Sequence, residues 1–285
     1  MKAQLIDGKQ ISAEIKAEAA EEAAALKAKG ITPCLAVVLV GDDSASQVYV
    51  NNKKKACEAV GIRSVSHVLS GGTTEEALLE LIAKLNADKD IHGILVQMPV
   101  PKQIDERKVI LAIDPKKDVD CFHPVNVGNL HTGGEGFLPC TPAGIIELIK
   151  RSGHSIEGKQ CVVIGRSNIV GKPVAMLLMQ ENGTVTICHS KTRNLAEICR
   201  GADIIVSAVG KVNTVTADMV KEGAILIDVG MNRNEAGKLC GDVDFENVKE
   251  IAGAITPVPG GVGPMTIAML MKNCNIAAKI QNGLE

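Results

Sequence analysis

Aromatic residues are scarce in this sequence, which has three Phe, one Tyr and no Trp among its 285 residues. The core must therefore be filled with aliphatic side chains and Met. Proteins that bind nucleic acid by stacking bases on aromatic side chains need more rings than this. A strong excess of basic residues is lacking too, because 31 Lys and Arg face 33 Asp and Glu. We therefore expect neither a nucleic-acid partner nor binding to an anionic membrane.

The sequence also lacks paired cysteines and long apolar runs. None of its nine cysteines forms a CxxC pair, which argues against a zinc ribbon or a disulfide framework and favours a reducing cytoplasm. Cys121 and His123 lie near Asp118 and Asp120 but have no second ligand pair, so we expect no metal. No apolar run approaches the ~20 residues of a membrane span, and the amino terminus lacks the apolar segment of a signal peptide.

Two series of alternating strands and helices fill the chain, whose length suits two domains. This alternation predicts an α/β fold with parallel strands. In the first series we expect helices and strands in turn at residues 10–29, 35–40, 44–60, 64–69, 73–86 and 93–98. In the second we expect strands at 161–165, 184–188, 202–209, 224–230 and 252–257, followed by a Met-rich closing helix. Residues 115–142 show little periodicity, and we place the domain boundary near residue 140.

A glycine-containing loop, GRSNIVGKP at residues 165–173, joins a predicted strand to a predicted helix. In dinucleotide-binding domains such a loop brings backbone N–H groups to a phosphate. The spacing is irregular, because Ser167 and Val170 stand where the usual GxGxxG pattern has its second and third glycines. From spacing alone, a phosphate loop and an ordinary strand-to-helix turn are equally good interpretations.

The residues after the next strand favour NADP over NAD. NAD-binding domains usually carry an acidic residue about 20 positions past the glycine loop, where it binds the ribose 2′-hydroxyl. No acidic residue lies between Gly183 and Ala196, whereas the segment CHSKTRN at 188–194 offers Ser190 and two basic residues. Arg166 in the glycine loop adds another positive charge. We therefore expect NADP, with its 2′-phosphate, and a solvated basic turn is the alternative.

Three further features could carry chemistry. Ser46, Tyr49 and Lys53 are three and four residues apart, so a helix places them on one face. Lys53 could act there as an acid or base, and a solvated surface lysine is the alternative. Gln97 stands at the carboxyl end of a predicted strand, where the ligands of α/β sheets gather. The segment PVPGGVGPMT at 257–266 forms a rigid loop that either approaches a ligand or makes a tight corner.

Together these segments resemble the family of bifunctional methylenetetrahydrofolate dehydrogenases/methenyltetrahydrofolate cyclohydrolases. The matching motifs follow the family's order from residue 40 to residue 266: VGDDSASQVYVNNKKKAC, GILVQMPVP, DPKKDVDCFHPVNVG, FLPCTPAG, GRSNIVGKP, ILIDVG and ITPVPGGVGPMT. The resemblance implies a folate-binding catalytic domain at 1–140, a Rossmann-like NADP-binding domain at 141–263 and a cleft between them. It also implies a homodimer and a closing helix, 264–285, that packs on the first domain.

The resemblance further implies two reactions on tetrahydrofolate one-carbon derivatives, and with them a role in purine biosynthesis. The first is the NADP-dependent oxidation of 5,10-methylenetetrahydrofolate to 5,10-methenyltetrahydrofolate. The second is the hydrolysis of that product to 10-formyltetrahydrofolate.

The family's functional residues correspond to positions in this sequence. By resemblance, Lys53 is the catalytic acid/base group, Tyr49 and Gln97 orient it and bias its protonation, and Asp120 binds the pterin. The expected substrate-binding residues are Ser46, Tyr49, Lys53, Val96, Gln97, Met98, Asp120, Pro259, Gly260, Gly261 and Gly263. The expected cofactor-binding residues are Gly165, Arg166, Ser167, Ser190 and Met231.

Two positions depart from the family pattern. Cys121 follows Asp120 where the family usually has glycine, and Met231 stands where isoleucine is common. We expect a side chain at position 121 to shift the Asp120 loop or to tighten the pterin pocket. Two rival interpretations remain. A two-domain NADP dehydrogenase similar to shikimate dehydrogenase would leave Tyr49 and Gln97 unexplained, and a catalytically silent binding module would form no NADPH from methylenetetrahydrofolate and NADP.

Overall fold

The structure is a computed structural model that describes residues 3–284, without the side chains of residues 44 and 45. It divides into two compact units. The three-stranded unit comprises residues 14–140 and 267–284, and the six-stranded unit comprises residues 3–13 and 141–266. The division falls within two helices, α1 (Gly8–Ala28) and α10 (Val262–Gln281).

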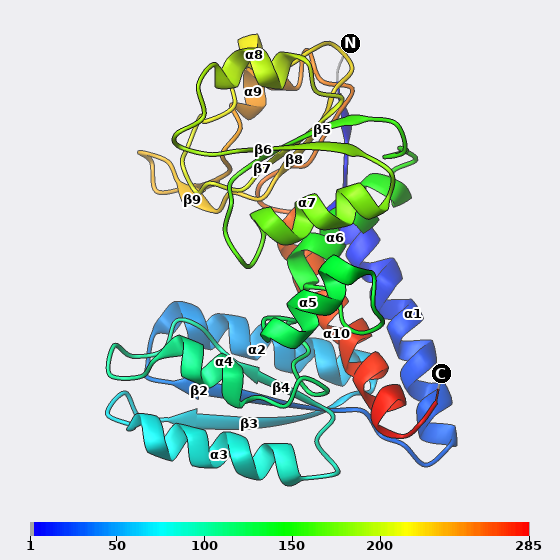
Figure 1. Ribbon diagram of the computed structural model, residues 1–285, viewed down its shortest axis with the longest axis vertical. Coiled ribbons are helices and arrows are strands. Elements are labelled where there is room, and N and C mark those ends of the chain that lie inside the picture. The colour runs from blue at the N-terminus through cyan, green and yellow to red at the C-terminus, as the bar shows by residue number, and fades with distance from the viewer. Residues whose placement is uncertain (1–2, 285) are drawn as a thin grey trace. The chain divides into compact units, whose positions relative to one another are not determined.

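The three-stranded unit is built on a parallel sheet with the order β3-β2-β4 (Figure 1). The central strand has the sequence CLAVVLV, and all seven of its residues are buried, as expected for a parallel strand that is covered on both faces. The strands are β2 (Cys34–Val40), β3 (Arg63–Leu69) and β4 (Gly93–Val96). Four helices accompany them: α2 (Ser44–Val60), α3 (Glu75–Ala87), α4 (Glu106–Ala112) and α5 (Pro124–Thr132).

The ends of α2 are set by local sequence signals. The Asp43 carboxylate accepts a hydrogen bond from the Ser46 backbone N–H at 2.8 Å, which satisfies a donor of the first turn. Gly61 ends the helix with a φ of +83°, in the left-handed region that favours glycine. Because the helix is uninterrupted between these ends, Tyr49 and Lys53 lie one turn apart on the same face.

The six-stranded unit contains a parallel sheet with the order β1-β11-β8-β7-β5-β6. The strand order reverses at β5, because β6 lies on one side of it and β7 on the other. Such a switch point is where doubly wound α/β sheets bind ligands, at the carboxyl ends of the strands. The strands are β1 (Gln4–Leu5), β5 (Gln160–Ile164), β6 (Thr184–Cys188), β7 (Ile204–Ser207), β8 (Ile225–Asp228) and β11 (Ala254–Ile255).

Aliphatic side chains fill the core of this unit. Fifteen buried residues form one cluster of Val, Ile, Leu, Ala, Met and Cys, and Phe245 packs against it from the side. The remaining elements are the helices α6 (Cys140–Arg151), α7 (Gly171–Gln180), α8 (Leu195–Arg200) and α9 (Phe245–Val248), the short turn of 3₁₀ helix at Ala217–Met219, and the hairpin of β9 (Asn232–Arg233) and β10 (Leu239–Cys240).

The predicted two-domain α/β architecture with parallel strands is confirmed, and each predicted strand overlaps an observed one. The amino terminus differs from the prediction, since β1 pairs with β11 and residues 3–13 therefore belong to the six-stranded unit. A strand of two residues has too little periodicity to be detected from sequence. Segment 115–142, in which the sequence predicts no element, contains α5 and the start of α6. The cleft between the domains stays a prediction.

Among the described helices, none combines the length and the apolar character that a bilayer crossing requires.

Candidate active site

Lys53 and Gln97 form the centre of the candidate site in the three-stranded unit. Lys53, on α2, donates from Nζ to Gln97 Oε1 at 2.8 Å. Gln97 follows β4 directly, and its backbone N–H donates to Val38 O at 2.8 Å, which extends the pairing with β2 by one residue. The Gln97 side chain is also fixed from its other end, because Nε2 donates to Met98 O at 2.9 Å. These contacts hold a carbonyl oxygen towards the lysine.

Asp120 lies within the electrostatic reach of this pair. Burial raises the pKa of the Asp120 carboxyl to about 6, the positive charge of Lys53 lowers it, and the nearby Asp118 carboxylate raises it. The Cys140 thiol lies 3.9 Å from Asp120 Oδ1 and is a weak hydrogen-bond donor, which also lowers the pKa of Asp120. Asp120 is thus a half-buried acceptor whose ionised form is supported by one cation and one thiol.

The backbone beside Asp120 is anchored by two residues that the sequence analysis missed. Asn273, a buried residue of α10, donates from Nδ2 to Val119 O at 2.8 Å and to Leu138 O at 2.9 Å. Cys140 donates to the same Val119 carbonyl at 3.5 Å. No signal in the sequence marks Asn273, because Lys272 and Asn275 make this part of the helix polar as well and its partners lie more than a hundred positions away.

Cys121 adopts a backbone conformation that explains why glycine suits this position. Its φ is +61°, in the left-handed region that side chains other than Gly, Asn and Asp rarely adopt. The side chain is buried, and its thiol donates to Phe137 O at 3.2 Å. This contact ties the residue after Asp120 to segment 137–140, which carries Cys140.

The other predicted residues of this unit lie on α2, at the end of β4 or directly after Gln97. Ser46 is buried in the first turns of α2, and Val96 is buried at the end of β4. Met98 is half-buried, and Tyr49 keeps 41% of its surface exposed on the face of α2 that carries Lys53.

The glycine loop of the six-stranded unit has the close packing of a phosphate loop. A Cβ on Gly165 would lie 2.4 Å from Ala208 O, and one on Gly171 would lie 2.3 Å from Gly165 O. Gly171 thus provides the close helix packing that the GxGxxG pattern assigns to its third glycine, one position after Val170. Ser167, at the second glycine position, accepts from the N–H groups of Val170 and Gly171 at 3.1 and 3.2 Å.

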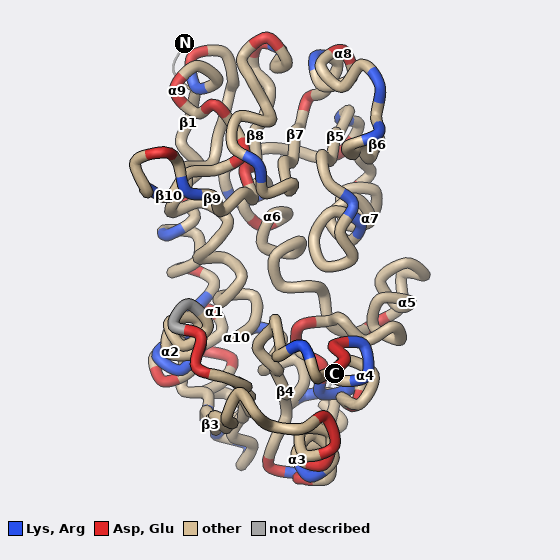
Figure 2. The backbone as a smooth tube through the Cα atoms, turned by 90° about the vertical axis from the view of Figure 1, so that its left-hand side faces the viewer, with Lys and Arg blue, Asp and Glu red and all other residues tan. Residues whose placement is uncertain are grey.

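A self-contained turn follows β6 and displays basic residues. The His189 N–H donates to Thr192 Oγ1 at 2.8 Å, which leaves Ser190, Lys191 and Arg193 exposed. The Gly165 N–H donates to Cys188 O at 2.9 Å, so this turn adjoins the glycine loop. Arg166 in the glycine loop and Lys172 in the first turn of α7 add two exposed basic residues, and blue marks this end of the helix in Figure 2. The exposed cations and the absence of a carboxylate in the turn at 189–193 fit the 2′-phosphate of NADP.

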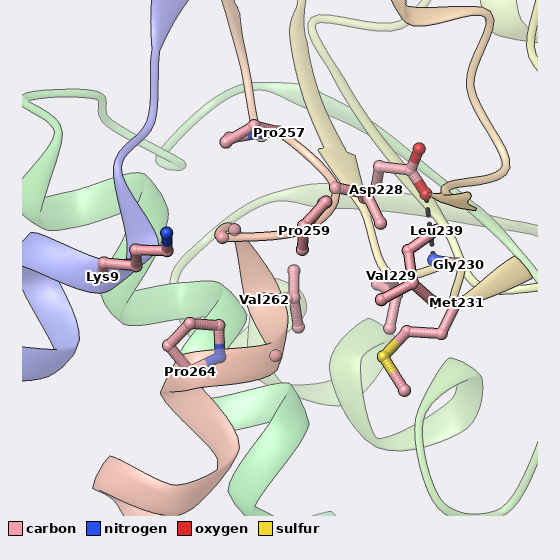
Figure 3. Close-up of a pocket in the computed structure, with 14 residues that line it drawn as sticks. Lys9, Asp228, Val229, Gly230, Met231, Leu239, Pro257, Pro259, Val262 and Pro264 are labelled. Carbon is pink, nitrogen blue, oxygen red and sulfur yellow. Dashed lines mark hydrogen bonds between the residues drawn. The ribbon is translucent and has the colours of Figure 1, made fainter.

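A pocket of about 200 Å³ lies in the same unit (Figure 3). Its lining includes the predicted residues Met231, Pro259, Gly260, Gly261 and Gly263. Lys9 and Asp228, which the sequence analysis did not select, line it too.

The glycine-rich loop at this pocket is packed against the start of α1. A Cβ on Gly8 would lie 1.8 Å from Gly261 O, so only glycine fits there. Gly260 has a φ of +111°. Among the described residues, no group of three or more His, Cys, Asp or Glu is placed to hold a metal ion.

Comparison with known protein families gives two matches that together span most of the chain. The catalytic domain of tetrahydrofolate dehydrogenase/cyclohydrolase matches residues 6–120, and its NAD(P)-binding domain matches residues 139–282. Among curated proteins, the bifunctional protein FolD of Acetivibrio thermocellus is 60% identical over 281 residues, which are 99% of this chain and 99% of that protein.

Solved structures give the same result. The FolD methylenetetrahydrofolate dehydrogenase/cyclohydrolase of Campylobacter jejuni has a TM-score of 0.95 and 53% identity, covering 98% of this chain and 99% of that one. The Trypanosoma brucei enzyme, solved with NADP and an inhibitor, has a TM-score of 0.92 and 42% identity over 98% of each chain. Shikimate dehydrogenase of Aquifex aeolicus, with a TM-score of 0.51 and 16% identity over 90% of this chain and 94% of that one, shares the fold alone.

The packing of the glycine loop predicts that Gly171→Ala weakens NADP binding. The added Cβ meets backbone atoms of Gly165 and Arg166, so the loop must move. We expect a dissociation constant raised about tenfold or more, and a loss of about 1–3 kcal/mol in the free energy of unfolding. Calorimetric titration with NADP and thermal unfolding measure both.

The matched control is Gly201→Ala, in the same unit. Its Cβ would find its nearest neighbour at an ordinary 3.5 Å, and its φ of −82° suits alanine. Equal NADP affinity in the two variants would show that the loop packing has no part in binding.

Proposed function

We propose a function for this chain on the premise that it belongs to the tetrahydrofolate dehydrogenase/cyclohydrolase family. It is a bifunctional enzyme that oxidises 5,10-methylenetetrahydrofolate with NADP to 5,10-methenyltetrahydrofolate and NADPH. It then adds water to the methenyl cation, which gives 10-formyltetrahydrofolate and a proton. The likeness to shikimate dehydrogenase is one of fold alone, so that rival interpretation and the silent binding module are set aside.

Lys53 moves the protons of the hydrolysis. The observation that carries this role is the 2.8 Å hydrogen bond from Lys53 Nζ to Gln97 Oε1, with Asp120 in electrostatic reach. Hydrolysis needs a group that takes a proton from the attacking water and returns one to a folate nitrogen as the ring opens. The neutral amine can accept the first proton, and the ammonium can donate the second. In both forms an N–H remains for Gln97 Oε1, so the nitrogen keeps its position throughout.

Asp120 fixes the register of the substrate by binding the pterin. A carboxylate accepts from the amino and ring N–H groups of a pterin in charge-assisted hydrogen bonds. The anchoring of Val119 by Asn273 and Cys140 supports this role, because it holds the backbone next to the carboxylate. Tyr49 packs along the folate with its exposed ring, and Ser46, Val96 and Met98 complete this side of the site.

The six-stranded unit binds the cofactor and a further part of the folate. NADP, when bound, accepts the hydride from the methylene group. Gly165 and Gly171 allow the backbone to approach its phosphates, and Arg166 and Ser190 bind the 2′-phosphate. Ser167 holds the loop in shape. We assign the loop Pro259–Gly263 to the folate and the backbone at Met231 to the nicotinamide, and their shared pocket supports both assignments.

We also propose a homodimer, a cytoplasmic location and a role in purine biosynthesis. The support for a dimer is the edge strand β3, which pairs only with β2 among the described strands and leaves Val68 65% exposed. An edge strand presents N–H and C=O groups with which a strand of another chain can pair. The support for the cytoplasm is that all nine cysteines are free. The product 10-formyltetrahydrofolate carries a formyl group that purine synthesis can use.

Replacing Lys53 tests the central assignment. We expect Lys53→Met to lower the cyclohydrolase rate about 100-fold or more, because general acid/base catalysis is worth about 10²–10⁴, and to lower the dehydrogenase less. The first activity is followed by the loss of methenyltetrahydrofolate absorbance and the second by NADPH formation. Lys54→Met, at an exposed position on the same helix, is the control. A Lys53→Met enzyme that hydrolyses at the wild-type rate would refute the role.

The pKa of Asp120 predicts how folate binding depends on pH. Since this pKa is raised to about 6, the carboxylate that accepts from the pterin is lost as the pH falls through about 6, and not through the usual range near 4. We expect the dissociation constant of tetrahydrofolate to rise about tenfold for each pH unit below 6. Calorimetry between about pH 7.5 and pH 5 measures it. Asp120→Asn should bind weakly and without this slope, and a flat wild-type profile would contradict the assignment.

The edge strand predicts the position of the dimer interface. We expect Val68→Lys to convert the dimer to monomers, because it places a charge on the edge strand that we assign to the interface, and sedimentation velocity measures the change. Ile187→Lys, on the edge strand β6 of the other sheet, is the control. A dimer that survives Val68→Lys, or dissociates with Ile187→Lys instead, would place the interface elsewhere.

A further inference from the structure

A buried carboxylate ties together two loops of the six-stranded unit. Asp242 lies between β10 and α9, and none of its surface is exposed. Its Oδ2 accepts from Ser207 Oγ, Val209 N and Gly210 N at 3.1, 2.8 and 3.2 Å. Its Oδ1 accepts from Lys211 N at 2.9 Å and Asn232 Nδ2 at 2.9 Å. Both oxygens are therefore saturated, and the donors come from the end of β7, the segment that follows it and the segment that follows β8.

A second aspartate holds the first in place. Asp228, the last residue of β8, is buried and accepts from the backbone N–H groups of Gly230, Asp242 and Val243 at 2.9, 2.8 and 2.9 Å. Its own N–H donates to Thr256 Oγ1 at 2.8 Å. Burial raises the pKa of Asp228 to about 6, the three N–H donors lower it, and the negative charge of Asp242 raises it. The structure thus keeps two carboxylates together.

The two aspartates are interlocked through glycines. A Cβ on Gly230 would lie 2.2 Å from Asp242 Oδ1, and a Cβ on Gly241 would lie 1.9 Å from Asp228 Oδ2. The Asp242 carboxylate thus fills the space beside Gly230, two residues after Asp228, and the Asp228 carboxylate fills the space beside Gly241, one residue before Asp242. We call this arrangement of Asp228, Gly230, Gly241 and Asp242 the aspartate clasp. Figure 3 shows the bond from Gly230 to Asp228 at the edge of the pocket.

The clasp lies where the reactive end of a dinucleotide is expected. The sheet order places β7 and β8 on the side of β5 opposite to β6. The phosphate loop follows β5, and the basic turn for the 2′-phosphate follows β6. A dinucleotide that runs across the carboxyl ends of these strands must carry its nicotinamide towards β7 and β8. The loops after those two strands are the ones that Asp242 joins.

We propose that Asp242 is a positioning residue for hydride transfer, which rests on the cofactor site proposed above. Its carboxylate fixes segments 209–211 and 230–232, so that the nicotinamide has a rigid surface on which to lie. Asp228 maintains the segment that carries Asp242. Hydride transfer depends on the distance and angle between the reacting carbons, so a small displacement of this surface is costly. Hydrolysis of the methenyl cation uses no nicotinamide and does not depend on it.

Asp242→Asn tests this role by separating the two activities. An amide has one acceptor oxygen and one NH₂ group, so the NH₂ must face N–H donors and one of the two segments is released. We expect kcat/KM for NADP in the dehydrogenase reaction to fall about tenfold to 100-fold. The cyclohydrolase rate, measured on methenyltetrahydrofolate without NADP, should stay within about twofold. A role confined to folding would lower both activities together.

Asp203→Asn is the matched control. Asp203 belongs to the same unit, accepts from Gln160 N at 2.8 Å and pairs with Lys221 at 2.5 Å. It precedes β7 and therefore lies at the amino ends of the strands, away from the carboxyl ends where the cofactor site is proposed. We expect this variant to keep the wild-type ratio of the two activities, even where it unfolds at a lower temperature.

The outcomes separate the inference from the proposed function. A wild-type protein that forms no NADPH refutes the proposed function. An active wild type combined with an unchanged activity ratio in Asp242→Asn refutes the inference alone. If Asp242→Asn does not fold, Asn232→Ala decides, because it removes one of the five donors to Asp242 from a half-buried position. It must then lower dehydrogenase activity, with cyclohydrolase activity kept, for the inference to stand.

Discussion

Burial of parallel strands on both faces is the constraint on which the rest of this structure depends. All residues of β2, β4, β7 and β8 are buried, so the faces of these four strands offer almost no place for a polar side chain in contact with a ligand. Polar groups must therefore collect where the strands end. Gln97 follows β4, Asp228 closes β8, and the glycine loop follows β5. The scarcity of aromatic residues adds to this, since aliphatic layers pack well but supply no polar edge.

The same constraint explains which parts could be predicted from sequence. Buried strands read as short apolar runs, so their positions and the residues that follow them are visible without a structure. The helix stripe of Tyr49 and Lys53 is visible for a similar reason. Neither pattern alone puts Lys53 Nζ 2.8 Å from Gln97 Oε1, because that distance depends on how α2 packs over its sheet. The link between them came from the family resemblance.

Interactions between distant segments account for what the sequence did not reveal. Asn273 and Val119 are 154 positions apart, and Asp242 and Ser207 are 35 apart. No periodic pattern connects such residues, and a buried Asp looks like a surface Asp when only its neighbours in sequence are known. Gly171 is an intermediate case: the sequence showed a glycine, but only the contact with Gly165 O shows that it replaces the third glycine of the usual pattern.

The distribution of functional groups over the two units gives a physical account of the two activities. Lys53, Gln97 and Asp120 all belong to the three-stranded unit, and the glycine loop, the basic turn and the clasp all belong to the six-stranded unit. Under the proposed assignments, the proton-transfer groups of the hydrolysis belong to one unit, whereas hydride transfer also uses the cofactor site of the other. The folate is the component common to both reactions. Burial raises the pKa values of Asp120 and Asp228 to about 6. Keeping each of these carboxylates ionised at neutral pH therefore lowers the free energy of unfolding. In return the Asp228 carboxylate accepts from three backbone N–H groups, and an apolar residue in its place would leave these buried groups without an acceptor.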